Sequence, residues 1–384
     1  MPGKEVVIVS AARTPVGCFN GALKKLTAPQ LGATAVKASV SRAGLTPDQI
    51  EEVYMGQVLQ AGVGQAPARQ VVIGSGMPES TEATTINKVC ASGMKAITLA
   101  AQNLQLGQRD IMVAGGMESM SNTPFYVQRG IQYGDQKLND AIIKDGLWDV
   151  YNQIHMGMCA ENTAANYNIS REAQDEHAIS SYKRAAEAWK NGVFDAEIAP
   201  VTIKEKKGDV VVKEDEEYKN VKFDKISGLN PVFKKDGTVT AANASTLNDG
   251  ASALVLMTRE KANELGVKPL AKIISYADAA CAPIDFTIAP SKAAPLALQK
   301  AGLDIKDISL FEFNEAFSVV ARILGLDPSK VNIAGGAVAL GHPIGSSGSR
   351  IVVTLTHLLK SGQFGLAAIC NGGGAASALI IQRE

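Results

Sequence analysis

The sequence "NKVCASGMKAITLAAQ" at residues 87–102 places Cys90 between a β-branched run, "TTIN" at 84–87, and a helix-forming segment rich in Ala, Met and Leu. A cysteine at such a junction lies beside unpaired N–H groups and the positive end of the helix dipole, which favour the nucleophilic thiolate. The alternative is a buried structural cysteine, because free Cys is among the most buried residue types. This stretch alone leaves both interpretations open.

The totals describe an ordinary globular chain. Its 384 residues can bury a large core, and the length predicts two or three domains. Hydrophobic residues make up 46% and charged residues 20%, with 38 basic residues balancing 38 acidic ones. This balance gives no indication of a nucleic-acid partner or an anionic membrane surface. No apolar run approaches the roughly 20 residues that a membrane helix needs.

The cysteines and the first residues bear on the compartment. The chain has no C-x-x-C pair, which argues against a disulfide framework or a zinc site and suits a reducing compartment. It opens "MPGKEVVIVSAARTP", without a signal-peptide or transit-peptide pattern. We therefore expect a cytoplasmic protein, or one of the mitochondrial matrix if a presequence has been removed. The five scattered cysteines are Cys18, Cys90, Cys159, Cys281 and Cys370.

Around the opening stretch, apolar strands alternate with helices. Runs at 5–10, 51–60 and 109–119 read as strands, which predicts an α/β protein with a mainly parallel sheet and helices on its faces. Residues 119–248 break the pattern because they are more polar, and we expect them to form an insertion that lies over the sheet. Their charged stretch at 204–225 has mixed signs and reads as a solvated hairpin and surface loop.

The second half repeats the order of the first. The strand at 308–318 matches 51–60, and the segment 331–362 takes the place of the Cys90 strand and helix. This duplication predicts two halves of one topology related by a pseudo-two-fold axis. His342, in "GHPIGSSG", then lies at the counterpart of the Cys90 junction, and the carboxyl ends of central strands would meet there, where α/β folds place their sites.

Flanking residues distinguish the other candidates. The glycines around His342 let the backbone approach a ligand closely, whereas His177 and His357 read as ordinary helix residues. Cys370 precedes "NGGG", whose N–H groups can form an oxyanion hole; the alternative is a buried cysteine before a turn. Asn314, in "FEFNEAFS", is either the N-cap of a following helix or a donor to the site, or both.

Seven motifs resemble those of the thiolase family, in the right order and across nearly the whole chain: "NKVCASGMKA", "AGGMESMS", "HMGMCAEN", "AANASTLNDGA", "FNEAFS", "GGAVALGHPIGSSG" and "ICNGGGAAS". The resemblance is to the biosynthetic branch, the acetoacetyl-CoA thiolases or acetyl-CoA C-acetyltransferases. It implies an α/β thiolase fold whose duplicated βαβαβαββ halves form a five-layered α-β-α-β-α core. The N-terminal half would be 1–118 plus 249–267, the loop domain that binds coenzyme A 119–248, and the C-terminal half 268–384.

The resemblance also implies the chemistry, a reversible condensation of two acetyl-CoA molecules to acetoacetyl-CoA and CoA. Cys90 would be acetylated while His342 takes its proton. Cys370, as thiolate, would remove a proton from the methyl group of the second acetyl-CoA. Asn314 would hold a water that forms one oxyanion hole with His342, and the N–H groups of Cys90 and Gly372 would form the other. A covalent intermediate predicts ping-pong kinetics.

The implied ligands are coenzyme A thioesters as substrates, with no cofactor required for the chemistry. A potassium ion would activate the enzyme, and the chain would form a homotetramer, a dimer of dimers, without nucleic-acid or membrane partners. The "HMG" at 155–157 favours acetyl over long acyl groups. The implied substrate contacts are Leu147, His155, Met156, Tyr182, Lys225 near the nucleotide, Phe233, Ala241, Ser245, Ala316 and Phe317. The implied potassium ligands are Tyr182, Ala241, Ala242, Ala244 and Val338.

Two departures from the family pattern and three rival readings remain. After "NEAFS" the chain has about four residues fewer than family members usually carry, roughly one helical turn, which bears on the setting of Asn314. Asn220 stands where close relatives often carry Arg near the nucleotide.

One rival is a degradative 3-ketoacyl-CoA thiolase of broader chain length. A non-catalytic acyl-CoA or lipid carrier would lack one or more of Cys90, His342 and Cys370, and a ketoacyl synthase would replace Cys370 by His or Asn.

Overall fold

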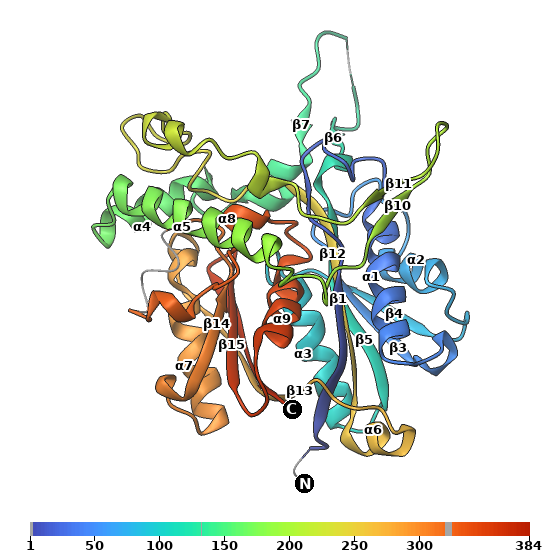
Figure 1. Ribbon diagram of the computed structural model, residues 1–384. Coiled ribbons are helices and arrows are strands. Elements are labelled where there is room, and N and C mark those ends of the chain that lie inside the picture. Colours follow the sequence, from blue (N-terminus) through green and yellow to red (C-terminus); the bar gives the residue numbers. More distant parts are fainter. Residues whose placement is uncertain (1–2, 132, 319–324) are drawn as a thin grey trace.

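The computed structural model describes residues 3–131, 133–318 and 325–384 (Figure 1). Within these ranges, no helix is both long enough and apolar enough to cross a membrane. The shortened segment after "NEAFS" lies outside the described residues apart from Gly325.

Ten of the described strands form one mixed sheet. From edge to edge its order is β14 (Ile308–Phe313), β15 (Phe364–Asn371), β16 (Ala375–Arg383), β13 (Ala271–Ala280), β1 (Val6–Arg13), β12 (Asn248–Thr258), β5 (Ile111–Ser119), β3 (Glu52–Gly56) and β4 (Glu82–Ile86), with β2 (Gly17–Cys18) beside β12. The prediction of a mainly parallel sheet is wrong. Only β14–β15, β3–β5 and β3–β4 pair in parallel, and the pairings from β15 through to β5 are antiparallel.

The antiparallel pairings have two sources. In each half, a late strand enters against the direction of its neighbours: β12 arrives from the inserted section, and β16 turns back directly after β15. The two halves then join edge to edge through the antiparallel pair β1–β13. The sequence pattern could not reveal this, because a strand buried on both faces reads as the same apolar run in either direction.

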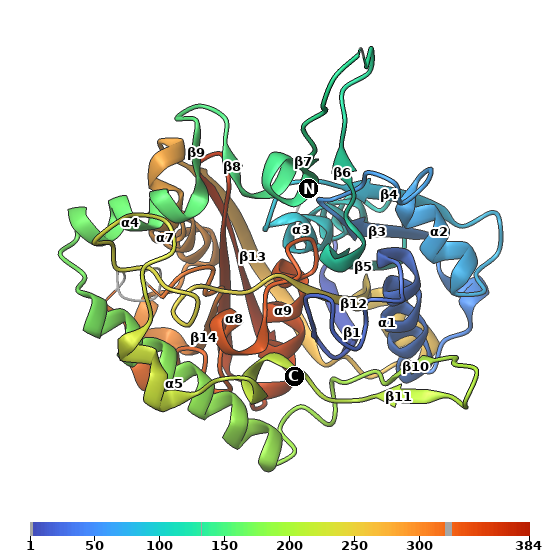
Figure 2. The same ribbon diagram turned by 90° about the horizontal axis from the view of Figure 1, so that it is seen from above.

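Helices and sheet alternate in five layers (Figure 2). The helices of the core are α1 (Ala28–Arg42), α2 (Pro67–Gly74), α3 (Ser92–Gln105), α6 (Arg259–Leu265), α7 (Pro290–Ala301), α8 (Ala337–Leu340) and α9 (Ser347–Leu358). The α1 and α2 helices pack on the outer face of the first-half strands, and α7 packs on the outer face of the second-half strands. The α3 and α9 helices share one apolar cluster with the inner faces of both halves. The five-layered duplicated core predicted from the sequence is therefore confirmed.

The section between β5 and β12 crosses one end of this core, with the β6–β7 hairpin projecting from it (Figure 1). In this section the helix at residues 171–190 starts at Ser170, whose side chain accepts a hydrogen bond from an N–H in the first turn. Thr27 caps α1 of the core in the same way. The elements of this section are β6 (Phe125–Tyr126), β7 (Asn139–Asp140), a π-helical turn (Ile142–Leu147), β8 (Trp148–Asp149), β9 (Ile154–His155), α4 (Met156–Asn166), α5 (Arg171–Lys190), β10 (Val201–Ile203) and β11 (Val210–Val212).

The charged stretch at 204–225 is only partly the solvated hairpin that the sequence predicts. It supplies the turn and second strand of the β10–β11 hairpin, but Asp215 is fully buried. There the Arg13 guanidinium, at the end of β1, binds Asp215 Oδ1 at 2.8 Å and also pairs with Glu197. A buried guanidinium needs such carboxylate partners to offset its lost hydration. The pair of carboxylates fastens the inserted section to β1.

Candidate active site

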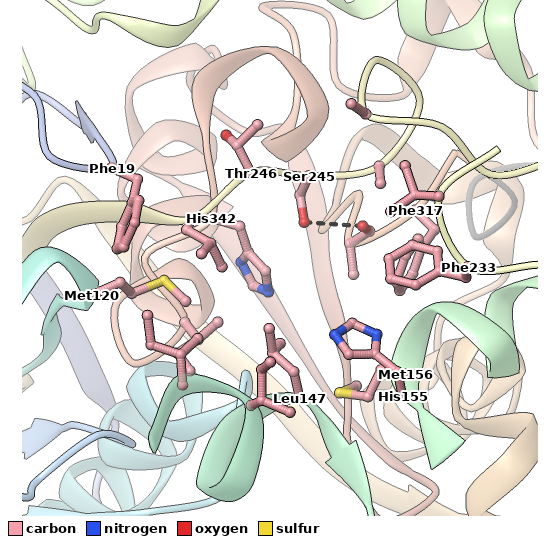
Figure 3. A pocket seen from close by; sticks show the side chains of 18 of the residues that line it. Phe19, Met120, Leu147, His155, Met156, Phe233, Ser245, Thr246, Phe317 and His342 are labelled. Carbon is pink, nitrogen blue, oxygen red and sulfur yellow. Dashed lines mark hydrogen bonds between the residues drawn. The ribbon is translucent and has the colours of Figure 1, made fainter. Parts of the chain in front are cut away.

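A mostly apolar cavity of about 610 Å³ lies between the inserted section and the core (Figure 3). It is lined by both junction residues, Cys90 and His342, and by side chains on β9, α4 and the loops before β12 and after β14. The residues of the predicted site that line it are Cys90, Leu147, His155, Met156, Phe233, Ala241, Ala244, Ser245, Ala316, Phe317 and His342.

Cys90 lies in the turn that connects β4 to α3, two residues before the helix begins at Ser92. The sequence had suggested that the strand before Cys90 is central in the sheet. The structure instead places this strand, β4, at the edge. Glycines bring this turn against the second half. A Cβ at Gly93 would lie 2.6 Å from Ser349 Oγ, and one at Gly348 would lie 2.7 Å from the Met94 nitrogen. The close crossing of α3 and α9 carries Cys90 toward the loop that holds His342.

His342 lies in the loop between α8 and α9, directly after Gly341, whose φ of 98° a side chain would disfavour. Its N–H donates to Asn248 Oδ1 at 2.8 Å. Its Nδ1 lies 2.7 Å from Ser347 Oγ, which itself lies 3.0 Å from the Pro343 carbonyl oxygen. When Ser347 donates to that carbonyl, Nδ1 carries the ring proton and Nε2 is the basic nitrogen. Nε2 is buried and has no partner within the described residues.

The second thiol, Cys370, is near the end of β15 and fully buried opposite Ala376 of β16. Cys90 lies close enough to raise the pKa of Cys370 electrostatically. Two residues on, the N–H of Gly372 lies close enough to Cys90 to favour the thiolate form and so to lower its pKa. A Cβ at Gly372 would lie 3.5 Å from Val89 and Met156. The turn after β15 therefore brings a backbone donor to the thiol of the other half.

Burial controls the protonation of all three groups. It raises the pKa of Cys90 to about 12, despite the N–H groups of Gly372 and of Cys90 itself, which favour the thiolate. Burial also raises the pKa of Cys370 well above its ordinary value, and the nearby Cys90 adds to this. Burial, with the positive charge of Arg350, lowers the pKa of His342 to about 3. At neutral pH the free site holds two thiols and a neutral imidazole, so the helix terminus does not by itself produce a thiolate.

Asn314 follows β14, which is parallel to β15, so the ends of these two strands lie at the same edge of the sheet. Its side chain is buried, and neither Nδ2 nor Oδ1 has a partner within the described residues, so it does not cap a described helix. The next residue, Glu315, binds Ser181 Oγ at 2.8 Å and His177 Nε2 at 3.1 Å. These contacts of Glu315 with α5 hold the segment on which Asn314 lies. His177, expected to be an ordinary helix residue, has this bracing contact.

Aromatic side chains form one wall of the cavity (Figure 3). The rings of His155 and Phe233 stack with centroids 4.7 Å apart, and Phe233 meets Phe317 edge-on. Gly157 must lack a side chain here, because a Cβ would lie 2.3 Å from the Phe233 ring. Ser245 Oγ donates at 2.9 Å to the carbonyl of Ala316, the chain neighbour of Phe317. The wall is mostly apolar, which suits a flexible thioester arm.

Seven of the predicted residues do not line this cavity: Cys370, Asn314 and Gly372, whose places are described above, and Tyr182, Lys225, Ala242 and Val338. Tyr182, Lys225 and Ala242 line a neighbouring cavity of about 240 Å³ that shares Asn220, Glu217 and Ala241 with the main one. Val338 is buried in the cluster that contains Tyr182 and lines neither of the two. The main cavity thus brings together eleven of the predicted residues and leaves these seven outside its lining.

The sequence reasoning missed several residues around the site. Cys18 and Phe19 line the cavity, but they come from a segment read only as a loop. Met120 also lines it and lies in the quoted motif "AGGMESMS", which could have pointed to it. Glu118 is buried and accepts hydrogen bonds from the N–H groups of Val58, Leu59 and Gly345, which holds the His342 loop against β5. Asn248 lies in the quoted motif "AANASTLNDGA", which could have pointed to it.

Comparison with known sequences agrees with this geometry. The sequence model of the thiolase N-terminal domain matches residues 6–260, and that of the thiolase C-terminal domain matches 267–383. The chain therefore belongs to the thiolase family. It is 63% identical to the acetyl-CoA acetyltransferase of Yarrowia lipolytica, over 98% of this chain and 96% of that protein. It is 60% identical to the mitochondrial acetyl-CoA acetyltransferase of Homo sapiens, over 99% and 91% of the two chains.

Solved structures show the same fold. The Acat5 thiolase from Ascaris suum, in complex with coenzyme A, is 51% identical and superposes with a TM-score of 0.96, covering 99% of this chain and all of that one. The acetyl-CoA acetyltransferase of Bacillus anthracis is 41% identical, with a TM-score of 0.96 over the full length of both chains.

Proposed function

We propose that this chain is an acetyl-CoA C-acetyltransferase, which condenses two acetyl-CoA molecules to acetoacetyl-CoA and CoA in a reversible reaction. The observation that carries the proposal is that Cys90 and the basic Nε2 of His342 line one apolar cavity, while a second thiol, Cys370, lies near Cys90 in the apolar cluster that also contains Met156 and Phe317 of the cavity wall. Relatives that bear this activity in their names, at 60–63% identity, support it. A non-catalytic carrier would have no need of this arrangement.

In the first half-reaction, Cys90 is the nucleophile. Its proton passes to His342 Nε2, which is buried and has no competing described partner. The sulfur attacks the acetyl carbonyl, and the coenzyme A thiolate leaves and takes the proton back from His342. The N–H group of Gly372, together with that of Cys90, stabilises the charge that develops on the carbonyl oxygen. The product is acetyl-Cys90, and the covalent intermediate makes the kinetics ping-pong.

In the second half-reaction, Cys370 is the base. Because burial keeps the thiol protonated in the free protein, Cys370 first passes its proton to His342 Nε2. The thiolate then removes a proton from the methyl group of the second acetyl-CoA, and the resulting carbanion attacks the acetyl group on Cys90. As the new C–C bond forms, the bond to the Cys90 sulfur breaks, and Cys90 leaves as a thiolate that takes the proton from His342. Asn314, through a water, and His342 bind the enolate oxygen. Asn314 suits this role because both polar atoms of its side chain are buried and free of described partners.

The aromatic wall of the cavity suits the pantetheine arm of an acyl-CoA. His155 and Phe233 stack and Phe317 closes on them, so the pantetheine arm lies along this wall with Leu147 and Met156 near the acyl end. Its complex with coenzyme A makes the Ascaris suum thiolase a guide to this placement. Further along the cavity wall are Ala241, Ser245 and Ala316, with Lys225 in the neighbouring cavity toward the nucleotide.

Chain length separates this function from a degradative thiolase. We expect thiolysis of acetoacetyl-CoA with a kcat/KM at least about ten times that for longer 3-ketoacyl-CoA substrates, because one missing or extra methylene is worth roughly 10–200-fold in a closed pocket. Steady-state assays on a series of chain lengths measure this. Equal values across the series would identify the degradative rival, and no turnover on any substrate would identify the carrier.

We further propose a potassium site next to the cavity. Tyr182, Ala241 and Ala242 line the smaller cavity together. No donor to the carbonyl oxygens of Ala241, Ala242 or Ala244 is found within the described ranges, and carbonyl oxygens suit a hard cation. With the Val338 carbonyl, they would hold the ion and thereby stiffen the loop that carries Ser245. Replacing K⁺ by Na⁺ should then lower kcat, and an unchanged rate would contradict the site.

We also propose a homotetramer, a dimer of dimers. The β6–β7 hairpin projects from the body and exposes a series of large apolar side chains, which is typical of a protein–protein contact (Figure 1). Light scattering of the purified chain would give the mass of four chains, and polar substitutions on the hairpin would reduce it. The exposed side chains are Phe125, Val127, Ile131, Tyr133 and Leu138.

Two predictions from the sequence remain predictions. One is the division into halves at 1–118 plus 249–267 and 268–384, around the loop domain 119–248. The other is the cytoplasmic location. Relatives from Xenopus laevis and Homo sapiens are mitochondrial by name, and imaging of the tagged protein in its own cell would decide between the two compartments.

A further inference from the structure

The turn that carries Cys90 contains a strained residue. Val89, directly before Cys90, has a φ of +48°. A β-branched residue rarely adopts this left-handed conformation, because its side chain clashes with the neighbouring backbone. Such strain persists only where the surrounding structure fixes it. The turn at residues 87–92 therefore depends on the contacts that hold it in this conformation.

Some of these contacts are internal to the turn. Asn87 Oδ1 accepts from the Val89 N–H at 3.0 Å. Ser92 Oγ accepts from the Lys88 N–H at 2.8 Å and donates to the Val89 carbonyl at 2.5 Å. These bonds close the turn on itself and onto the start of α3. They do not orient it relative to the half of the molecule that carries Cys370.

Lys88 supplies that orientation. Its Nζ lies 2.5 Å from Asp278 Oδ1 on β13 and 2.8 Å from Ser377 Oγ on β16. Asp278 and Ser377 are direct cross-strand partners, and the neighbour of Ser377, Ala376, is the partner of Cys370. The ammonium group therefore ties the nucleophile turn to the strand pair beside the second thiol. Its partner carboxyl is firmly ionised, since Lys88, Lys95 and Ser377 outweigh burial and lower the pKa of Asp278 to about 2.

Lys95 binds the same carboxylate from a different place. Its Nζ lies 2.7 Å from Asp278 Oδ2. The side chain is as exposed as that of Lys88, at 26% against 22%. However, Lys95 belongs to α3, whose backbone is already fixed by helical hydrogen bonds. The two lysines thus bind the same carboxylate with similar exposure. They differ in that the ammonium group of Lys88 holds the strained turn, whereas that of Lys95 holds a helix.

We propose that Lys88 is a positioning residue for the proposed reaction. By tying the strained turn to β13 and β16, it sets the sulfur of Cys90 relative to Cys370 and to the N–H of Gly372. The proposal rests on the proposed function, because it assigns Lys88 a part in the same site. It assigns Lys95 only a part in the contact between the halves.

The test compares Lys88→Met with Lys95→Met in the full-length protein. A misplacement of about 1 Å can cost 100-fold in rate, so we expect the Lys88→Met variant to lose about ten-fold or more in kcat with little change in KM. The Lys95→Met variant should stay within about two-fold of wild type. Thermal unfolding midpoints of the two variants should agree, because each removes one ammonium group from Asp278. Lys88→Arg, which keeps the charge and donors, should recover most of the rate.

A second comparison addresses the strain itself. Asn tolerates the left-handed conformation much better than Val. In a Val89→Asn background the turn needs less external support, so adding Lys88→Met should reduce kcat by a smaller factor than it does in wild type. Equal factors in the two backgrounds would show that Lys88 acts without regard to the strained residue, and would overturn the proposal.

The readouts separate this inference from the proposed function. If wild type does not turn over acetoacetyl-CoA, the proposed function fails. Alkylation of Cys90 by iodoacetamide, followed by mass spectrometry, still reports how the turn is held. A rate of alkylation altered in Lys88→Met but not in Lys95→Met supports the tie. Equal effects of the two substitutions on both alkylation and kcat would overturn it.

Discussion

The Cys90 turn and the His342 loop occupy matching places in the two halves, yet they are built differently. Three residues separate the end of β4 from Cys90, and α3 begins two residues later. In the second half, the strand that should match β4 is reduced to a single bridge between Phe311 and Val331. The short α8 helix and a glycine-rich loop then intervene before α9.

The difference shows how one duplicated junction can supply two chemical groups. The short first junction holds a thiol rigidly at the start of a helix. The longer second junction leaves room for an imidazole to reach the same cavity. Each is also held from the other half: Lys88 binds Asp278 of β13, whereas the loop of His342 is held by Asn248 of β12 and Glu118 of β5. The site exists only where both halves are joined.

The largest expected effect comes from removing the first junction's thiol. Cys90→Ala should lower both thiolysis and condensation by at least about a thousand-fold, since nucleophile loss removes the covalent route. His342→Ala should cost less than Cys90→Ala within the usual range for a general base, about 100- to 10,000-fold, because the covalent route remains. Steady-state assays in both directions measure this. A Cys90→Ala variant with near wild-type turnover would show that the first junction does not carry the nucleophile.

Cys370→Ala separates the two steps. Because Cys90 and His342 remain, the variant should still accumulate acetyl-enzyme when mixed with acetyl-CoA. Condensation should fall about 100- to 10,000-fold, the loss expected for a missing base. Mass spectrometry of the intact protein detects the acetyl group, and Cys159→Ala is a control for a buried thiol outside the site. Loss of acetylation together with condensation would place Cys370 in the first step instead.

The duplicated α/β architecture could be predicted because it depends on signals that are local or repeated, whereas the five layers were implied by the resemblance to thiolases. Apolar runs mark the strands, and the second half repeats the order of the first. Strand direction was not predictable, because β12 and β16 look like their neighbours and differ only in how the chain arrives. The edge position of β4 was missed for the same reason: pairing partners are a property of the assembled sheet.

The site was predictable where a residue carries the chemistry itself, and less so where it supports another residue. Cys90, His342 and Cys370 have unusual types in unusual settings, so motifs identify them. Glu118 and Lys88 lie in two of the quoted motifs, "AGGMESMS" and "NKVCASGMKA", but as charged residues at a strand end and in a turn they give no sign of which residues they contact. Their contacts, to Gly345 and to Asp278, join segments more than 180 residues apart. No local pattern encodes such a contact.

The smallest expected effect is on the pH dependence of the free energy of unfolding, to which two buried titratable groups contribute, one from each half. The pKa of His342 is lowered to about 3 from 6.5, by burial and then by Arg350. Below pH 6.5 only the unfolded chain takes up this proton, so the contribution of His342 to stability is lost as the pH falls. The pKa of Glu118 is raised to about 7 from 4.5, by burial and despite three N–H donors. Its contribution is present at low pH and is lost as the pH rises through 7.

Because the two contributions oppose each other in wild type, variants are needed to resolve them. One proton is worth about 1.4 kcal/mol per pH unit. Between pH 7 and pH 5 the free energy of unfolding of His342→Asn, relative to wild type, should therefore rise by about 2 kcal/mol. That of Glu118→Gln should fall by a similar amount, about 2–3 kcal/mol. Urea unfolding at the two pH values measures both. If neither difference changes with pH, burial does not set the charge of these groups, and the neutral imidazole at the second junction must have another cause.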